Sequence, residues 1–187
     1  KILDDHRATE TVFAVGAEVQ KDPAAVRAEA AIGQVANHSY SHPFLDQMTN
    51  DQVFNELLGT NQIIKSLTGT APVLFRPPFD RVNESTEGIV HSLGMTTVLW
   101  NIDSGDYLGK KDVVQSFASA KAGDVILIHD GIASTKMELS QALDQLQAHK
   151  LCTGKIVPST TPHFAWHTQD FGDITFKAAV VSPGTKG

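Results

Sequence analysis

Two histidines lie four residues apart in the segment ANHSYSHP, which spans residues 36–43. The segment is rich in small hydroxyl residues, and Pro43 directly follows the second histidine, so a tight turn is expected. The spacing of His38 and His42 allows two imidazole rings to bind one divalent metal ion, with a carboxylate and water completing the shell. Taken alone, the segment is explained slightly better by an ordinary polar turn.

Other polar residues follow predicted strands at their carboxyl ends. Arg76 precedes two prolines, which fix the backbone so that the guanidinium group can be held toward a carboxylate; its alternative role is to bind strand-end carbonyl groups. His129 follows four apolar residues, and a carboxylate beside it would suit it as a general acid, although a buried core histidine is the alternative. The remaining candidates of this kind are Asp103, Asp106 and Asp130, for which a plain solvated loop is the alternative.

Elements with alternating character must position these residues. Short apolar runs predict strands, and longer amphipathic stretches predict helices. The expected strands are 11–16, 34–37, 72–75, 96–102 and 125–128, the last being the most clearly buried. The expected helices are 23–31, 49–66, 84–93, 112–121 and 135–149, with capping boxes opening at Thr49 and Thr135. This alternation indicates an α/β fold with parallel strands, whose carboxyl ends share one edge and would bring the polar residues together.

Composition limits the partners of the chain. Its 187 residues are 41% hydrophobic and 19% charged, which favours one globular domain, residues 1–187. The net charge of −6 argues against nucleic acid or an anionic membrane as a partner. No apolar run reaches the roughly 18 residues of a membrane helix, and the first residues lack the apolar region of a signal peptide. Cys152 is the single cysteine, which excludes an internal disulfide, and we expect a monomer.

Taken in order, the motifs resemble those of the polysaccharide deacetylase family, carbohydrate esterase family four, the NodB-homology domain. The resemblance covers about residues 1–150 and rests on ATETVFAVG at 8–16, HSYSH at 38–42, RPPF at 76–79, LWNIDSGDY at 99–107 and VILIHD at 125–130. It implies a distorted (β/α) barrel with fewer than eight strands, in which residues 150–187 form a tail that closes the barrel. It also implies a secreted or cell-surface protein.

The resemblance further implies metal-dependent removal of N-acetyl groups from a chitin, chito-oligosaccharide or peptidoglycan-type glycan. His38 and His42 would hold the metal, zinc first, with cobalt or nickel as alternatives. His129 would protonate the leaving amine, with Asp106 orienting it and Arg76 steadying the catalytic base. The backbone N–H near Phe79 would bind the oxyanion, and Leu127 would line the pocket for the acetyl methyl group. The remaining substrate-binding candidates are Tyr107, which replaces the family's usual tryptophan, and Trp100.

The family's first motif, T-F-D-D-G, which supplies the general base and a third metal ligand, has no match in this sequence. Asp4 and Asp5 are rejected as that motif because too few residues separate them from the strand at 11–16 for a parallel crossover. We therefore expect the first strand to be missing from this sequence. The alternatives are an O-acetyl xylan esterase, an α/β sugar-binding protein without metal, and an inactive relative that binds glycan through aromatic residues. Those aromatic residues would be Trp100, Tyr107, Phe164 and Trp166.

Overall fold

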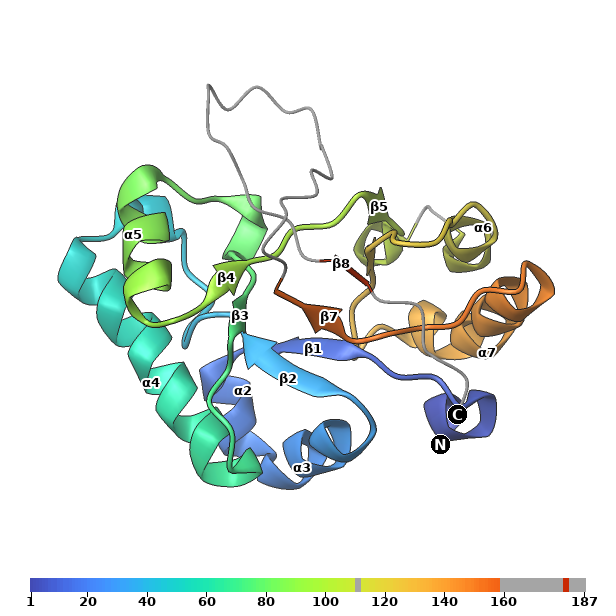
Figure 1. Ribbon diagram of the computed structural model, residues 1–187, viewed down its shortest axis with the longest axis horizontal. Coiled ribbons are helices and arrows are strands. Elements are labelled where there is room, and N and C mark those ends of the chain that lie inside the picture. Colours follow the sequence, from blue (N-terminus) through green and yellow to red (C-terminus); the bar gives the residue numbers. More distant parts are fainter. Residues whose placement is uncertain (110–111, 159–179, 182–187) are drawn as a thin grey trace.

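The computed structural model describes residues 1–109 and 112–158 and the backbone of residues 180–181. The aromatic candidates Phe164 and Trp166, with most of the predicted tail, lie outside the described residues. The described elements wrap helices around a central group of strands (Figure 1).

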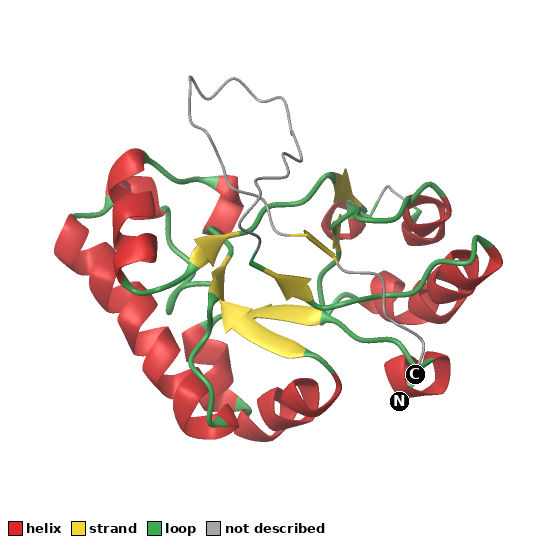
Figure 2. Cartoon of the chain, in the orientation of Figure 1, coloured by secondary structure: helices red, strands yellow, loops and turns green. Residues whose placement is uncertain are grey.

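The first half of the chain forms a four-stranded parallel sheet in the order β1-β2-β3-β4. Its strands are β1 (Thr11–Ala14), β2 (Gln34–Asn37), β3 (Leu74–Phe75) and β4 (Thr96–Thr97). The helices between and after these strands are α2 (Gly16–Lys21), α3 (Pro23–Ile32), α4 (Asn50–Thr68) and α5 (Glu84–Ser92), and they lie outside the strands (Figure 2). Thr49 caps α4 with the predicted capping box, which confirms that expectation.

The second half contains a separate parallel pair, β5 (Ile102–Asp103) and β6 (Ile126–Leu127). Helices α6 (Val113–Ala118) and α7 (Ala133–Ala148) pack together beside it, and α1 (Ile2–His6) packs on α7. An antiparallel pair, β7 (Ile156–Val157) and β8 (Val180–Val181), follows in the chain. Three short 3-10 helices complete the described elements: Leu45–Gln47, Pro78–Asp80 and Asp106–Leu108.

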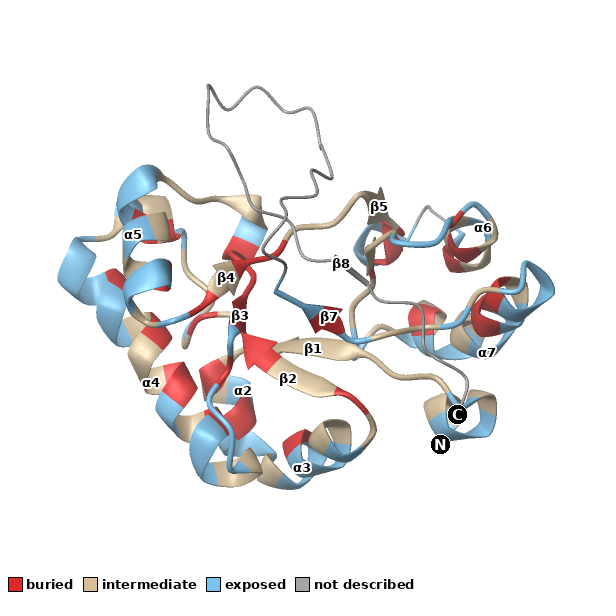
Figure 3. Ribbon diagram, in the orientation of Figure 1, coloured by how far each residue is buried: buried red, intermediate tan, exposed pale blue. Residues whose placement is uncertain are grey.

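The predicted fold class is confirmed. The strands of the two parallel sheets form an incomplete barrel, and no closed barrel occurs among the described residues. Ala36, Leu74, Val98 and Ile156 form one buried cluster, so β2, β3 and β7 share a core with the segment that follows β4. Figure 3 shows buried segments in these strands. None of the helices in the described part of the chain is both long and apolar enough to cross a membrane.

Three details of the predicted elements are wrong. The expected strand 96–102 is split into β4 and β5, because the Arg76 guanidinium group binds the carbonyl oxygens of Val98 and Leu99 between them. The run 125–128 is not the most buried strand: of its residues only Leu127 is fully buried, since the run lies in a two-stranded sheet. Thr135 does not cap a helix, because α7 begins earlier, at Ala133.

Candidate active site

The histidine turn, residues 38–42, directly follows β2. His38 Nδ1 lies 2.7 Å from the Arg76 carbonyl oxygen, which can only accept, so Nδ1 carries the proton and Nε2 keeps its lone pair. Burial lowers the pKa of His38 to about 4 and also lowers the pKa of His42. The two rings meet edge to face with their centroids 4.8 Å apart. Both imidazoles are therefore neutral at pH 7, which is the state that binds metal ions.

The two imidazoles fit two positions of a divalent metal site. The carbonyl partner of His38 is the usual outer contact that fixes a metal-binding tautomer. Within residues 1–109 and 112–158, no third His, Cys, Asp or Glu side chain joins the pair. The described residues would therefore supply only part of a metal shell, and a further ligand would be needed to complete it.

Asp106 and His129 form a second polar centre. The Asp106 carboxylate is 2% exposed; Oδ1 accepts from His129 Nδ1 at 2.8 Å, and Oδ2 accepts from the His129 backbone N–H at 2.7 Å. Burial raises the pKa of Asp106, but these bonds and one from Thr135 outweigh it and hold that pKa below its usual range. Asp106 is therefore a carboxylate at neutral pH that orients the His129 ring and leaves Nε2 available for proton transfer.

Thr135 is the residue of this centre that the sequence interpretation missed. Its side chain is buried, and Oγ1 donates to Asp106 Oδ2 at 2.7 Å. The sequence signal is a hydroxyl residue shortly after the His129–Asp130 pair, at a position that predicts a helix cap. The structure places it under the carboxylate instead, because α7 begins two residues before it.

Arg76 contacts the histidine turn through its backbone and the segment between β4 and β5 through its side chain. Its carbonyl holds His38, while its guanidinium Nε and Nη2 donate to Val98 O at 3.2 Å and Leu99 O at 3.4 Å. The guanidinium lies 4.0 Å from the Phe13 ring centroid and 5.4 Å from that of Trp100. Burial lowers its pKa to about 9, so Arg76 stays positive at pH 7. The carbonyl-binding alternative thus describes its observed contacts.

Two exposed aromatic rings flank the histidines. Phe79, with a positive φ of 58° that is sparsely populated outside glycine, lies 4.7 Å from the His42 ring. Tyr107 lies 5.2 Å from the His129 ring. Trp100 lies against Arg76, and Leu127 is buried two residues before His129, so neither shares the exposure of the flanking pair.

Both centres follow the carboxyl ends of parallel strands: His38 and His42 follow β2, and His129 follows β6. Burial is the main cause of the low pKa values of His38 and His42, and the nearby His129 lowers both further. Arg76 is thus bound to the histidine turn, and the Asp106–His129 pair lies near enough to influence both histidines of the turn. Asp4 and Asp5 lie elsewhere, in α1, where they pair with Lys1.

The described chain is an incomplete (β/α) barrel with paired histidines after the end of a parallel strand, and comparison with known proteins gives its family. The family model described as polysaccharide deacetylase matches residues 1–98, and the chain belongs to that family.

Relatives agree in fold and family. The bifunctional xylanase/xylan deacetylase of Cellvibrio japonicus is 35% identical over 153 residues, covering 80% of this chain and 23% of the relative. The peptidoglycan-N-acetylglucosamine deacetylase PgdA of Listeria monocytogenes is 29% identical over 150 residues, covering 78% of this chain and 32% of the relative. The family 4 carbohydrate esterase from Streptomyces lividans, solved in complex with acetate, has a TM-score of 0.84 and 30% identity, covering 98% of this chain and 88% of that chain. The chain spans only a quarter to a third of the two curated relatives.

Proposed function

We propose that the protein hydrolyses N-acetyl groups on a glycan of the chitin, chito-oligosaccharide or peptidoglycan type and releases acetate. The observation that carries the proposal is the pairing of two unlike histidine environments at one edge: a neutral, buried imidazole pair and an imidazole held by a carboxylate. The peptidoglycan deacetylase relative supports the substrate class. Such a substrate places the activity outside the cytoplasm.

His38 and His42 would hold a divalent metal ion, zinc first, with cobalt or nickel as alternatives. When bound, such an ion polarises an acetyl carbonyl and activates water. The residues of the chain do the rest. His129 gives a proton to the leaving amine nitrogen from Nε2, because Asp106 fixes Nδ1–H. The Phe79 backbone N–H would help to stabilise the oxyanion.

The remaining residues shape the site around the acetyl group. Leu127 would line the pocket for its methyl group, and Tyr107 and Trp100 would contact the sugar. The positive charge of Arg76 would steady a carboxylate base. O-acetyl xylan is the second candidate substrate, because a xylan deacetylase is 35% identical to this chain.

Acetate release tests both candidates. The protein is incubated with acetylated chito-oligosaccharide and, separately, with acetylated xylan, with and without a chelator. We expect release that the chelator abolishes and zinc restores, faster on the N-acetyl substrate. Release that ignores the chelator would overturn the metal role. Faster release from xylan would assign the O-acetyl substrate, and glycan binding without any release would indicate an inactive relative.

A further inference from the structure

The histidine turn has an unfavourable backbone conformation. Ser39 and His42 have φ values of 63° and 58°, a region that costs of order 1–3 kcal/mol for residues other than glycine. Such a turn persists only when its surroundings hold it. Within the turn, the Ser39 N–H donates to Asn37 Oδ1 at 2.8 Å and the His42 N–H donates to Ser39 Oγ at 3.1 Å.

Helix α2 holds the carbonyl side of the turn. The N–H groups of Gly16 and Ala17 donate to the carbonyl oxygens of Ser39 and Tyr40, each at 2.9 Å. These first N–H groups of a helix have no partner within it, so the turn satisfies them. Gly16 permits the approach, since a Cβ atom there would lie 2.8 Å from the Tyr40 ring and 2.6 Å from Thr60 Oγ1.

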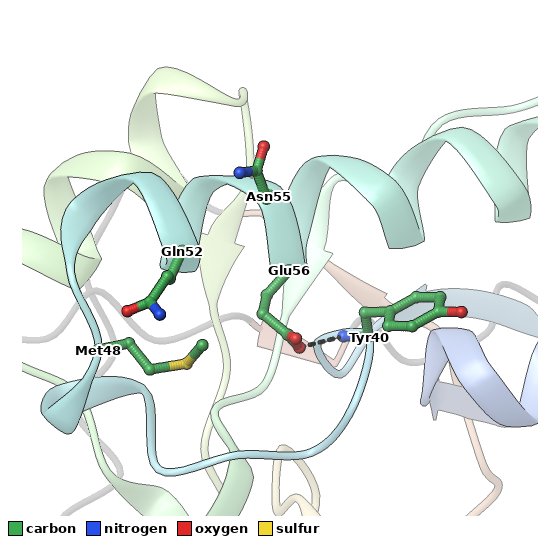
Figure 4. A pocket seen from close by; sticks show the side chains of 5 residues that line it. All are labelled: Tyr40, Met48, Gln52, Asn55 and Glu56. Atoms are coloured by element: carbon green, nitrogen blue, oxygen red, sulfur yellow. Dashed lines mark hydrogen bonds between the residues drawn. The ribbon is translucent and has the colours of Figure 1, made fainter.

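Glu56 of α4 holds the amide side. Its Oε2 accepts from the backbone N–H groups of Tyr40 at 2.9 Å and Ser41 at 2.8 Å, and its Oε1 accepts from Ser41 Oγ at 2.8 Å. Figure 4 shows the carboxylate reaching from the helix to the Tyr40 amide. Hydrogen bonds to a charged acceptor are about twice as strong as neutral ones, so this carboxylate is the strongest polar contact of the turn.

We propose that Glu56 is a positioning residue that fixes His42 against His38 and thereby prepares the pair to bind a metal ion. The metal part rests on the proposed function; the positioning part does not. Glu56 touches neither imidazole and acts through Tyr40 and Ser41, which lie between them. It borders a hollow of about 280 Å³ lined by Tyr40, Met48, Gln52, Asn55 and Glu56 (Figure 4). Water in this hollow can bind the two N–H groups when the carboxylate is removed, so we expect variants to fold.

Two measurements test the proposal on Glu56→Ala and Glu56→Gln. In metal-free protein, NMR shifts of the His42 ring protons report its place beside His38 and Phe79. We expect Glu56→Ala to move them toward unfolded-peptide values and Glu56→Gln to move them less, because an amide oxygen still accepts one N–H. By chelator competition, we expect Glu56→Ala to weaken zinc binding about 10- to 100-fold, as loss of outer contacts of metal ligands does.

Thr49→Ala is the matched control, because it removes the cap of the same helix without touching the turn. It should lower the melting temperature and leave the His42 shifts and zinc affinity unchanged. Unchanged His42 shifts in Glu56→Ala, or equal shifts in Thr49→Ala, would overturn the proposal. The NMR result decides the positioning role even if the protein binds no zinc or releases no acetate, so failure of the proposed function stays distinguishable.

Discussion

In the half of the molecule built on β1–β4, the site histidine His38 lies against a backbone carbonyl, whereas in the half built on β5 and β6, His129 lies against a carboxylate. We call these the turn half and the carboxylate half. The turn half buries His38, and burial lowers its pKa to about 4. The carboxylate half leaves the His129 side chain 42% exposed and buries its partner Asp106.

The difference shows how one residue type serves two chemical tasks. A carbonyl fixes the tautomer of an imidazole without adding charge, so burial keeps the ring neutral and suited to bind a metal. A carboxylate also fixes the tautomer and leaves the other ring nitrogen of a more exposed imidazole available for proton transfer. The partner atom therefore separates the two roles more clearly than position in the barrel does.

Substitution of His129 should have the largest effect on activity. We expect His129→Ala to lower kcat for acetate release by about 10²–10⁴, the usual contribution of a general acid, with zinc content unchanged. His42→Ala should instead lower zinc content. The exposed His149, at the end of α7, gives the control His149→Ala, which should change neither. Loss of zinc in His129→Ala would contradict the division of roles between the halves.

The low pKa of His38 predicts a pH-dependent stability of the metal-free protein. An unfolded histidine has a pKa of about 6.5, so between that value and about 4 the unfolded chain binds more protons than the folded chain. Stability should fall as pH falls through this window, by about 2 kcal/mol between pH 7 and pH 5. Urea unfolding of chelator-treated protein measures this. His38→Gln should remove that part of the slope and His149→Gln should keep it; an unchanged slope in His38→Gln would contradict the assignment.

The sequence predicted best what is local. The strand 34–37 running into the histidines, the capping box at Thr49 and the strand running into Arg76 depend on neighbouring residues, and each is observed. Because the carboxyl ends of parallel strands share an edge, strand order also predicts that His129 lies near the histidine turn, in agreement with its effect on the pKa values of His38 and His42.

The sequence does not predict the details that depend on a hydrogen bond from a side chain far away in the chain. The sequence predicts a single strand over 96–102. The observed strand is interrupted where the side chain of Arg76, more than twenty residues earlier in the chain, binds the carbonyl oxygens of Val98 and Leu99. The sequence predicts Thr135 as a helix cap and Glu56 as a residue within a helix, yet each binds a group from another element. Periodicity reports which face of a helix is buried, and it carries no information on a hydrogen-bond partner across the fold.

The hydroxyl group of Thr135 should stabilise the carboxylate half of the molecule and leave the turn half unaffected. Thr135→Val keeps the shape and removes the donor to buried Asp106, so we expect a loss of about 1–2 kcal/mol at pH 7. The pKa of Asp106 should rise. A depressed carboxylate pKa stabilises the fold above the unfolded value of about 3.9 and loses that effect as pH falls, so the variant should differ less from the native protein in acid. Exposed Thr70→Val is the control; an equal loss there would contradict the prediction.

Removal of the repulsion between carboxylates of the two halves should have the smallest effect on stability. Burial, then the carboxylates of Asp130, Glu10 and Asp22, raise the pKa of Glu29 in α3 to about 6. A raised carboxylate pKa means that the folded state binds more protons between about pH 4.5 and 6, so stability falls as pH rises through that window. Glu29→Gln should therefore stabilise the protein by about 0.5–1 kcal/mol at pH 7, allowing for solvent screening, and have no effect at pH 4.

Asp130→Asn tests whether the carboxylate of Asp130 repels that of Glu29. Asp130 follows β6 in the carboxylate half, and Glu29 lies in α3 in the turn half. It should lower the pKa of Glu29, measured by NMR titration, and raise stability at pH 7 by less than Glu29→Gln does. Exposed Glu18, paired with Lys21 on α2, gives the control Glu18→Gln, which should leave the Glu29 titration unchanged. An unchanged Glu29 titration in Asp130→Asn would show that burial alone sets its pKa and that the halves do not repel each other at this point.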